Sequence, residues 1–337
     1  MKATGRTGEA LLALARNYME SRILLTAAQV DLFTFLARTP HTAAEVTAHL
    51  AGDARATAIV LDALTAMGLL RKVRGRYRCA PEIAPLLASD SPESVLPMVL
   101  HAASLWERWT ELTGIVRGDE AARARAYAQR GPERMAAFIG AMHVVSRGRA
   151  PEIVKAVKPG KARALLDIGG ASGTYILAFL NAVPQMRATL FDLPAVIALA
   201  RERLGAAGVL DRVTLAAGDF YQDELPGGHD LALLSAIIHQ NSPAQNVELY
   251  RKVWRALEPG GRLVVRDHVM SLDRTAPRGG AVFAVNMLCG TPGGNVYTFN
   301  EIRAGLSAAG FARVRLIQKG DERMNGLVEA FRPRGNA

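Results

Sequence analysis

The chain has 337 residues, of which 50% are hydrophobic, and its formal net charge is +10 at pH 7. This length and composition suit two domains with buried cores, and no apolar run reaches the ~18 residues that a membrane helix requires. The basic residues are scattered among alanines and form no lysine-rich tail, so solvated helical faces are favoured over a surface for nucleic acid.

The two cysteines, Cys79 and Cys289, stand far apart and lack the spacing of metal ligands. A disulfide framework and a zinc site are therefore not expected. Arg16 and Glu20 interrupt the apolar stretch that begins at Leu11, before a signal-peptide core could form. We expect a protein of the reducing cytoplasm.

The first part of the chain has the pattern of a winged helix. Thr42 and Glu45 form a capping box that opens one helix, and Gly68 is well placed to end another. Arg74 and Gly75 stand between the segments 69–73 and 77–79 and predict the turn of a hairpin wing. The predicted helices cover 9–37, 42–50 and 54–67, and the hairpin strands cover 69–73 and 77–79.

A winged helix can bind DNA or form a protein interface. The wing carries arginines that could contact phosphates. The helix over 54–67, however, has few side chains that could read base edges, and its apolar residues lie around much of its surface. This distribution favours burial in an interface. We therefore predict a dimerisation domain over 1–96.

A proline- and serine-containing connector over 81–97 leads to helices over 100–117 and 132–157. Phe138, Met142 and Ser146 are spaced at i, i+4 and i+8, which puts them on one face of the second helix. Spacing alone favours a core stripe. The predicted domains are 1–96, a helical connector over 97–157, and a catalytic domain over 158–337.

The stretch 164–173 organises the rest of the chain. An apolar strand over 164–168 breaks into a glycine-rich turn, and an amphipathic helix follows, as in a doubly wound α/β sheet. The dinucleotide pattern G-x-G-x-x-G fails here. The remaining pattern, D-x-G-x-x-x-G with Asp167, Gly169 and Gly173, is carried by Rossmann-like methyltransferases that bind S-adenosylmethionine (SAM).

Later strands of the same region also end in carboxylates. Asp192 follows the loop by about twenty residues, where an acidic residue meets ribose hydroxyls in such folds. Asp219 and Phe220 end the next strand and suit an adenine amino group and ring face. A Pro-Gly-Gly turn at 259–261 precedes the strand over 262–266. The order and spacing of these features favour SAM over a dinucleotide.

The segment Phe191-Asp192-Leu193-Pro194 is close to a signature of the small-molecule O-methyltransferases with an N-terminal winged-helix dimerisation domain. The chain resembles this family, which includes plant caffeic-acid-type and bacterial antibiotic-tailoring enzymes of secondary metabolism, from roughly residue 10 to residue 332. The resemblance implies a Rossmann-like class I methyltransferase fold and an intertwined homodimer. The cofactor-binding residues that it implies, with those of the loop, are Ser146, Asp167, Gly169, Gly170, Gly173, Asp192, Leu193, Asp219, Phe220 and Ser235.

His239 follows the apolar segment 231–238, at the position of the family's catalytic base. An imidazole suits proton removal from a phenol near neutral pH, although a histidine after a strand can also merely bond its own loop. Asp267 matches the family's glutamate that holds the catalytic ring, and His268 is a second, weaker candidate base. No metal is implied. The residues expected to line the acceptor site are Phe138, Met142, Asn286, Met287 and Thr291.

Several positions depart from the family pattern. Gln240 and Asn241 replace an Asp-Trp pair, and Val296 replaces a second carboxylate beside the histidine. Ser235 replaces a lysine that often touches SAM. These changes leave open C-methylation and a non-methylating enzyme of the same fold. A winged-helix DNA-binding regulator with a SAM-like effector is the other alternative.

The sequence thus predicts a cytoplasmic, homodimeric, SAM-dependent methyltransferase, with His239 as general base. The expected acceptor is a hydroxyl group of a small molecule of aromatic or polyketide type. Neither nucleic acid nor a membrane is expected as a partner.

Overall fold

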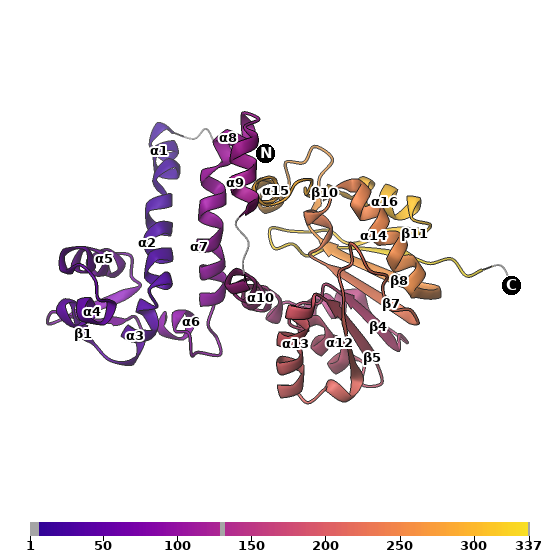
Figure 1. Cartoon of the computed structure of the whole chain (residues 1–337), viewed down its shortest axis with the longest axis horizontal. Helices are drawn as coiled ribbons and strands as arrows, with labels where there is room; N and C mark the ends of the chain where they lie inside the picture. Colours follow the sequence, from indigo (N-terminus) through magenta and orange to yellow (C-terminus); the bar gives the residue numbers. More distant parts are fainter. Residues whose placement is uncertain (1–6, 129–131, 336–337) are drawn as a thin grey trace. The chain divides into compact units, whose positions relative to one another are not determined.

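Figure 1 shows a computed structural model of the chain, which describes residues 7–128 and 132–335, without the side chains of 132–137. The chain forms two compact units. One comprises residues 1–106 and 131–144, and the other comprises residues 107–130 and 145–337. Among the described residues, none of the helices combines the length and the apolar character needed to span a bilayer.

The first unit contains the winged helix. Its three-stranded antiparallel sheet has the order β1-β3-β2, and Arg74 and Gly75 form the wing turn with φ of 49° and 76°. Its elements are α1 (Gly8–Arg16), α2 (Tyr18–Gln29), α3 (Leu32–Arg38), β1 (His41–Thr42), α4 (Ala43–Leu50), α5 (Ala54–Ala66), β2 (Leu70–Val73), β3 (Arg76–Cys79) and α6 (Ala84–Leu87). Helices α7 (Leu96–Thr110) and α10 (Pro132–Arg147) each contribute residues to both units.

Local sequence signals hold well in this unit. The capping box of Thr42 and Glu45 opens α4, and Gly68 follows α5 with φ 76°. The single helix predicted over 9–37 is wrong, because the chain forms α1, α2 and α3 there. Asp31 has a φ of 50°, which an aspartate tolerates but a continuous helix does not, and its carboxylate accepts a hydrogen bond from the Thr34 hydroxyl.

The second unit alternates strands and helices. The helices predicted over 100–117 and 132–157 are each divided in two, the second before Pro151, whose ring cannot continue a helix. The elements of this unit are α8 (Leu112–Val116), α9 (Glu120–Ala128), α11 (Ala150–Val157), β4 (Ala164–Ile168), α12 (Thr174–Ala182), β5 (Arg187–Asp192), α13 (Pro194–Ala206), β6 (Val213–Ala217), β7 (His229–Ser235), α14 (Pro243–Ala256), β8 (Leu257–Asp267), β9 (Val269–Met270), α15 (Arg278–Gly290), β10 (Tyr297–Thr298), α16 (Phe299–Ala308), β11 (Ala312–Gln318) and β12 (Gly326–Phe331), with short 3-10 turns at Leu210–Arg212 and Ile238–Gln240.

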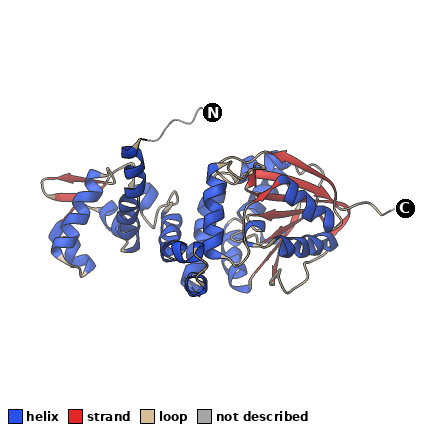
Figure 2. Cartoon of the chain, turned by 90° about the horizontal axis from the view of Figure 1, so that it is seen from above, coloured by secondary structure: helices blue, strands red, loops and turns tan. Residues whose placement is uncertain are grey.

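A seven-stranded sheet of order β11-β12-β8-β7-β4-β5-β6 forms the centre of this unit. Strands β4 to β8 are parallel, and β11 and β12 are antiparallel. Helices cover both faces (Figure 2): α11, α12 and α13 pack on one, and α14 and α16 on the other. The predicted Rossmann-like α/β class is confirmed.

Candidate active site

The glycine-rich loop joins β4 to α12 with almost no side-chain bulk. Gly169 has φ 68°, and a Cβ added there would lie 2.5 Å from Cδ1 of Ile237 and 3.9 Å from Cε1 of Phe220. A Cβ at Gly170 would lie 2.8 Å from Oδ2 of Asp167, and one at Gly173, which has φ 75°, would touch α13. The bare backbone is therefore required here, and the structure brings the loop next to Phe220.

Asp192, at the end of β5, holds this loop in place. Its carboxylate accepts hydrogen bonds from the backbone N–H groups of Ala171 at 2.9 Å and of Leu193 at 2.8 Å. Burial raises the pKa of Asp192 above its ordinary value, and the two hydrogen bonds oppose that change. A carboxylate has about four lone-pair sites, so acceptor capacity remains for a ligand.

Asp167, at the end of β4, is 1% exposed, and its Oδ2 has no hydrogen-bond partner among the described residues. Burial, together with the negative charge of Asp192, raises the pKa of Asp167 to about 7. An unpartnered buried carboxylate is unfavourable, which indicates a site for a ligand donor.

Asp219 and Phe220 follow β6 on the other side of the loop. The Asp219 carboxylate accepts hydrogen bonds from the N–H of Tyr221 at 2.9 Å and from the side-chain amide of Gln222 at 3.2 Å. The Gly218 N–H donates to the carbonyl of Asp192 at 3.0 Å, so this turn is joined to the end of β5. The structure thus brings the strand-end carboxylates predicted from sequence to one edge of the sheet.

His239 and Asp267 form a buried pair at the carboxyl ends of β7 and β8. Nδ1 of His239 lies 3.0 Å from Oδ1 and 2.9 Å from Oδ2 of Asp267, and the residues are 8% and 1% exposed. The His268 N–H donates to Oδ1 of Asp267 at 2.8 Å. The ring of Phe283 packs edge-to-face on His239, with centroids 4.8 Å apart. Since Nδ1 faces a carboxylate, Nε2 is left as the basic nitrogen.

The residues after His239 form a buried amide network. Asn241 is 0% exposed and accepts a hydrogen bond from the hydroxyl of Tyr221 at 2.6 Å. Its side-chain amide donates to Asn246 at 3.0 Å, and Asn246 donates back to the carbonyl of Ile238 at 3.0 Å. Tyr297 donates to the carbonyl of Asn241. Asn241, which departs from the family pattern, therefore fixes the loop that carries His239, and it does so through these hydrogen bonds.

Other predicted residues have identified partners. Asn286 and Met287 lie on α15, where the amide oxygen of Asn286 accepts a hydrogen bond from Trp109 Nε1 at 3.1 Å and Met287 is 8% exposed. The Thr291 hydroxyl donates to the carbonyl of Met287 at 2.8 Å and accepts from the Gly294 N–H at 2.9 Å.

The remaining predicted residues lie on α10 or next to the ends of strands. Phe138 and Met142 belong to the first unit and Ser146 to the second, so their roles stay predictions. Ser235 ends β7 and accepts a hydrogen bond from Arg266 at 3.1 Å. Val296 is 2% exposed and offers no side-chain hydrogen bond.

Three residues near the site were not predicted from the sequence, namely Arg266, Tyr175 and Phe283. Arg266 is 2% exposed, so its charged side chain lies within the protein. The one available signal was an arginine in the last positions of an otherwise apolar strand, where burial is expected. Phe283 contacts both His239 and His268, with a centroid distance of 5.4 Å to the second ring, and no sequence pattern marks it.

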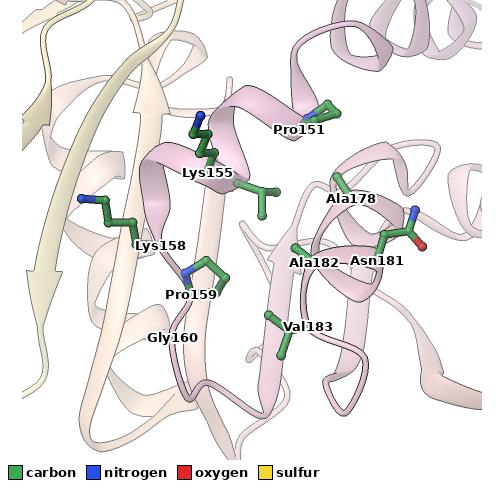
Figure 3. Close-up of a pocket in the computed structure, with 10 residues that line it drawn as sticks. Pro151, Lys155, Lys158, Pro159, Gly160, Ala178, Asn181, Ala182 and Val183 are labelled. Carbon is green, nitrogen blue, oxygen red and sulfur yellow. The ribbon is translucent and has the colours of Figure 1, made fainter.

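A surface hollow of about 540 Å³ lies elsewhere in this unit. Lys155, Lys158 and Asn181 are among the residues that line it, and they come from α11, the segment after it, and α12 (Figure 3). The segment precedes β4, and Asn181 is near the end of α12. The hollow is therefore at the amino end of β4, away from the glycine-rich loop and His239.

Comparisons with known proteins agree with this geometry. A family model described as O-methyltransferase domain matches residues 109–312, and one described as O-methyltransferase dimerisation domain matches residues 12–88. The chain is 32% identical over 328 residues to 3-hydroxy-5-methyl-1-naphthoate 3-O-methyltransferase of Streptomyces sahachiroi, covering 94% of this chain and 93% of that protein.

Two further relatives are informative. The chain is 32% identical over 313 residues to the tetracenomycin polyketide synthesis 8-O-methyl transferase TcmO of Streptomyces glaucescens, covering 90% of this chain and 91% of the relative. A solved structure described as PigF with SAH superposes with a TM-score of 0.84 at 27% identity, covering 97% of this chain and all of that one.

The cofactor of this family also fits the residues present. The glycine loop leaves bare backbone for close approach, and Asp167 presents a buried oxygen that has no donor in the part of the chain that the structure describes. SAM carries both an adenosyl group and an ammonium group. The chain belongs to the O-methyltransferase family with a dimerisation domain, and it is a SAM-dependent enzyme acting on small molecules.

Proposed function

We propose that the enzyme methylates a hydroxyl group of a small molecule of aromatic or polyketide type, with His239 as general base. The observation that carries this proposal is the buried contact between His239 and Asp267, which directs Nε2 away from the carboxylate. The names of the naphthoate and tetracenomycin relatives support the acceptor class.

The chemistry requires few groups. When bound, SAM would supply an electrophilic methyl group on a sulfonium for transfer to an oxygen nucleophile. His239 accepts the proton of the acceptor hydroxyl, and Asp267 stabilises the imidazolium that forms. Phe283 packs against the imidazole and limits the access of water to it. Gln240 and Val296 add no carboxylate to the pair, so we propose that Asp267 is the carboxylate that orients the ring.

The cofactor would be held by the residues that the structure gathers at the sheet edge. We propose that Asp192 binds the ribose hydroxyls, that Asp219 binds the adenine amino group, and that Phe220 packs on the adenine ring. The free acceptor capacity of Asp192 and the short distance from Phe220 to Gly169 support this arrangement. Backbone contacts are proposed for Gly169, Gly170, Gly173 and Leu193, and a contact with the methionine end for Ser146.

The acceptor would contact apolar side chains and a few polar groups. Phe138, Met142 and Met287 are proposed to pack on its rings. Asn286 uses its amide oxygen to accept from Trp109, so its amide N–H groups are the ones proposed for an acceptor oxygen. The Thr291 hydroxyl is already engaged in its own turn, which leaves its methyl group as the proposed contact.

The dimerisation domain supports a homodimer. Helix α1 has Leu11, Leu12 and Leu14 at 47–57% exposure and buries none of its residues within the chain. Such a face suits a second copy of the chain. Two of the wing arginines pair with glutamates, Arg71 with Glu82 and Arg76 with Glu45, and we propose no role in nucleic-acid binding. Both cysteines are buried and free, in agreement with the proposed cytoplasmic location.

The test is a methylation assay with the purified enzyme, SAM labelled with ¹³C in its methyl group, and a panel of hydroxylated naphthoic acids and polycyclic polyketides. We expect formation of S-adenosylhomocysteine and a product whose carbon signal is that of a methyl ether. A methyl group on carbon would contradict O-methylation. Duplex DNA binding without any turnover of the panel would support the regulator instead.

A further inference from the structure

The turn after β6 is a compact unit that bonds to itself. The carboxylate of Asp219 accepts the N–H of Tyr221 at 2.9 Å, and the Asp219 carbonyl accepts the N–H groups of Gln222 and Asp223 at 2.9 and 2.7 Å. The carboxylate of Asp223 accepts the N–H of Asp219 in return, at 2.8 Å. A ligand that contacts Asp219 therefore also fixes the backbone of Tyr221.

Tyr221 connects this turn to the loop that carries His239. Its ring lies against that of Phe220, with centroids 4.6 Å apart, and its hydroxyl donates to Oδ1 of Asn241 at 2.6 Å. Tyr221 is 48% exposed and Asn241 is 0% exposed, so a side chain at the surface reaches a buried amide. The tryptophan that Asn241 replaces has only an N–H donor and could not accept this bond.

The loop that carries His239 is short and begins in a strained backbone conformation. Ala236 has a φ of 57°, in the left-handed region that an alanine side chain disfavours. A 3-10 turn over Ile238–Gln240 follows, and its last N–H donates to the carbonyl of Ile237 at 3.1 Å. The hydrogen-bond geometry of such turns is poor, so contacts from other segments contribute to holding the loop.

Asn241 transmits the contact with Tyr221 to the residue before His239. Its side-chain amide donates to Asn246 at 3.0 Å, and the amide of Asn246 donates to the carbonyl of Ile238 at 3.0 Å. Three hydrogen bonds in series thus join the Tyr221 hydroxyl to the backbone of Ile238. The turn after β6 and the base lie at opposite ends of this series.

We propose that Tyr221 is a positioning residue that couples occupation of the cofactor site to the placement of His239. An adenine in contact with Asp219 and Phe220 fixes the turn, and the series of hydrogen bonds then holds the His239 loop. The base is therefore held most firmly when the cofactor is bound. This inference rests on the proposed function, which places adenine on Phe220 and makes His239 the base.

The test is hydrogen–deuterium exchange of the full chain with and without saturating S-adenosylhomocysteine. In the unmodified chain, exchange over 239–246 should slow at least about fivefold on binding, which is the effect of one hydrogen bond on a local opening equilibrium. In Tyr221→Phe this slowing should fall below about twofold. Exchange over 166–173 should still slow in that variant, because Lys252 holds the turn through the carbonyls of Phe220 and Asp223 at 2.9 and 2.8 Å.

Tyr297→Phe is the matched control. The Tyr297 hydroxyl also donates to Asn241, at its carbonyl, but it comes from β10 and not from the turn after β6. Loss of this bond should speed exchange over 239–246 equally with and without the ligand, so the fivefold slowing should remain. A role of Tyr221 that is merely structural would give this same pattern in Tyr221→Phe.

The two segments separate failure of the coupling from failure of the cofactor site. Full slowing over 239–246 in Tyr221→Phe would overturn the proposal. Slowing over 166–173 without any over 239–246 in the unmodified chain would also overturn it, while leaving the cofactor assignment intact. No slowing in either segment would overturn the proposed placement of the cofactor, and the coupling with it. If Tyr297→Phe does not fold, the comparison of Tyr221→Phe with the unmodified chain decides.

Discussion

Nδ1 of His239 lies 3.0 Å and 2.9 Å from the two carboxylate oxygens of Asp267, and Asp267 is further held by the N–H of His268. A carboxylate bonded in this way fixes the ring orientation and the tautomer, which leaves Nε2 as the base. Substitution of His239 and of Asp267, one at a time, therefore measures what each residue contributes to kcat.

His239→Ala should lower kcat for O-methylation by ~100-fold or more, because general bases contribute about 10²–10⁴-fold. The Kd for S-adenosylhomocysteine should stay near that of the unmodified enzyme, because the proposed cofactor contacts lie on other residues. Steady-state rates and calorimetry measure the two effects. His268→Asn is the matched comparison, and a larger loss in that variant than in His239→Ala would identify the other histidine as the base.

Asp267→Asn should lower kcat by ~10-fold or more while leaving the KM for SAM nearly unchanged. The amide is isosteric, but it carries no charge to stabilise the imidazolium and can bond either ring tautomer. The double variant His239→Ala/Asp267→Asn is the readout, since Asp267→Asn should cost little further activity once the imidazole is absent. Losses that multiply independently in the double variant would show that Asp267 does not act through His239.

Asp167→Asn should raise the melting temperature of the cofactor-free protein at pH 8. The carboxyl group ionises at about pH 3.8 in the unfolded chain and at about pH 7 in the folded one, so its ionisation destabilises the fold as pH rises through that window. The gain should be at least ~2 °C at pH 8, where each kcal/mol corresponds to ~2–4 °C, and should shrink towards pH 4. Differential scanning calorimetry at both pH values checks it, and a gain independent of pH would contradict the buried charge.

Asn241→Leu should reduce kcat by ~10-fold with little change in cofactor affinity. The substitution removes the bonds that Asn241 makes with Tyr221 and Asn246 and so loosens the loop that carries His239. Tyr221→Phe deletes one of these bonds and should produce a smaller effect. Separate measurement of kcat and of the Kd for S-adenosylhomocysteine tests this, and equal losses in both would indicate general unfolding of the site.

Leu12→Glu on α1 should shift the enzyme from dimer to monomer. The side chain is 57% exposed within the chain, so a charge there costs nothing in the isolated protomer but is unfavourable in an apolar interface. Sedimentation equilibrium gives the mass. Arg16→Glu at the end of the same helix is the control, and a monomeric unmodified protein would contradict the proposed dimer.

Much of the candidate site could be predicted because it depends on short-range order. Asp167, Asp192 and Asp219 each lie within two residues of the end of a strand, and parallel strands bring their carboxyl ends to one edge whatever the details of packing. The capping box at Thr42 and the turn at Gly75 are equally local. These features follow from residue type and spacing, so the linear sequence determines them.

Tertiary structure decided the rest. His239 and Asp267 are 28 residues apart, and they meet because β7 and β8 become neighbours. The burial of Arg266 beside Tyr175, and the lack of partners for both, depends on which groups remain unpaired once α12 has packed on the sheet. Phe283 contacts His239 and His268 because α15 packs beside the ends of β7 and β8. Asp31 ends a helix that hydrophobic periodicity alone would continue. Such features arise from contacts between distant segments, which spacing along the chain does not encode.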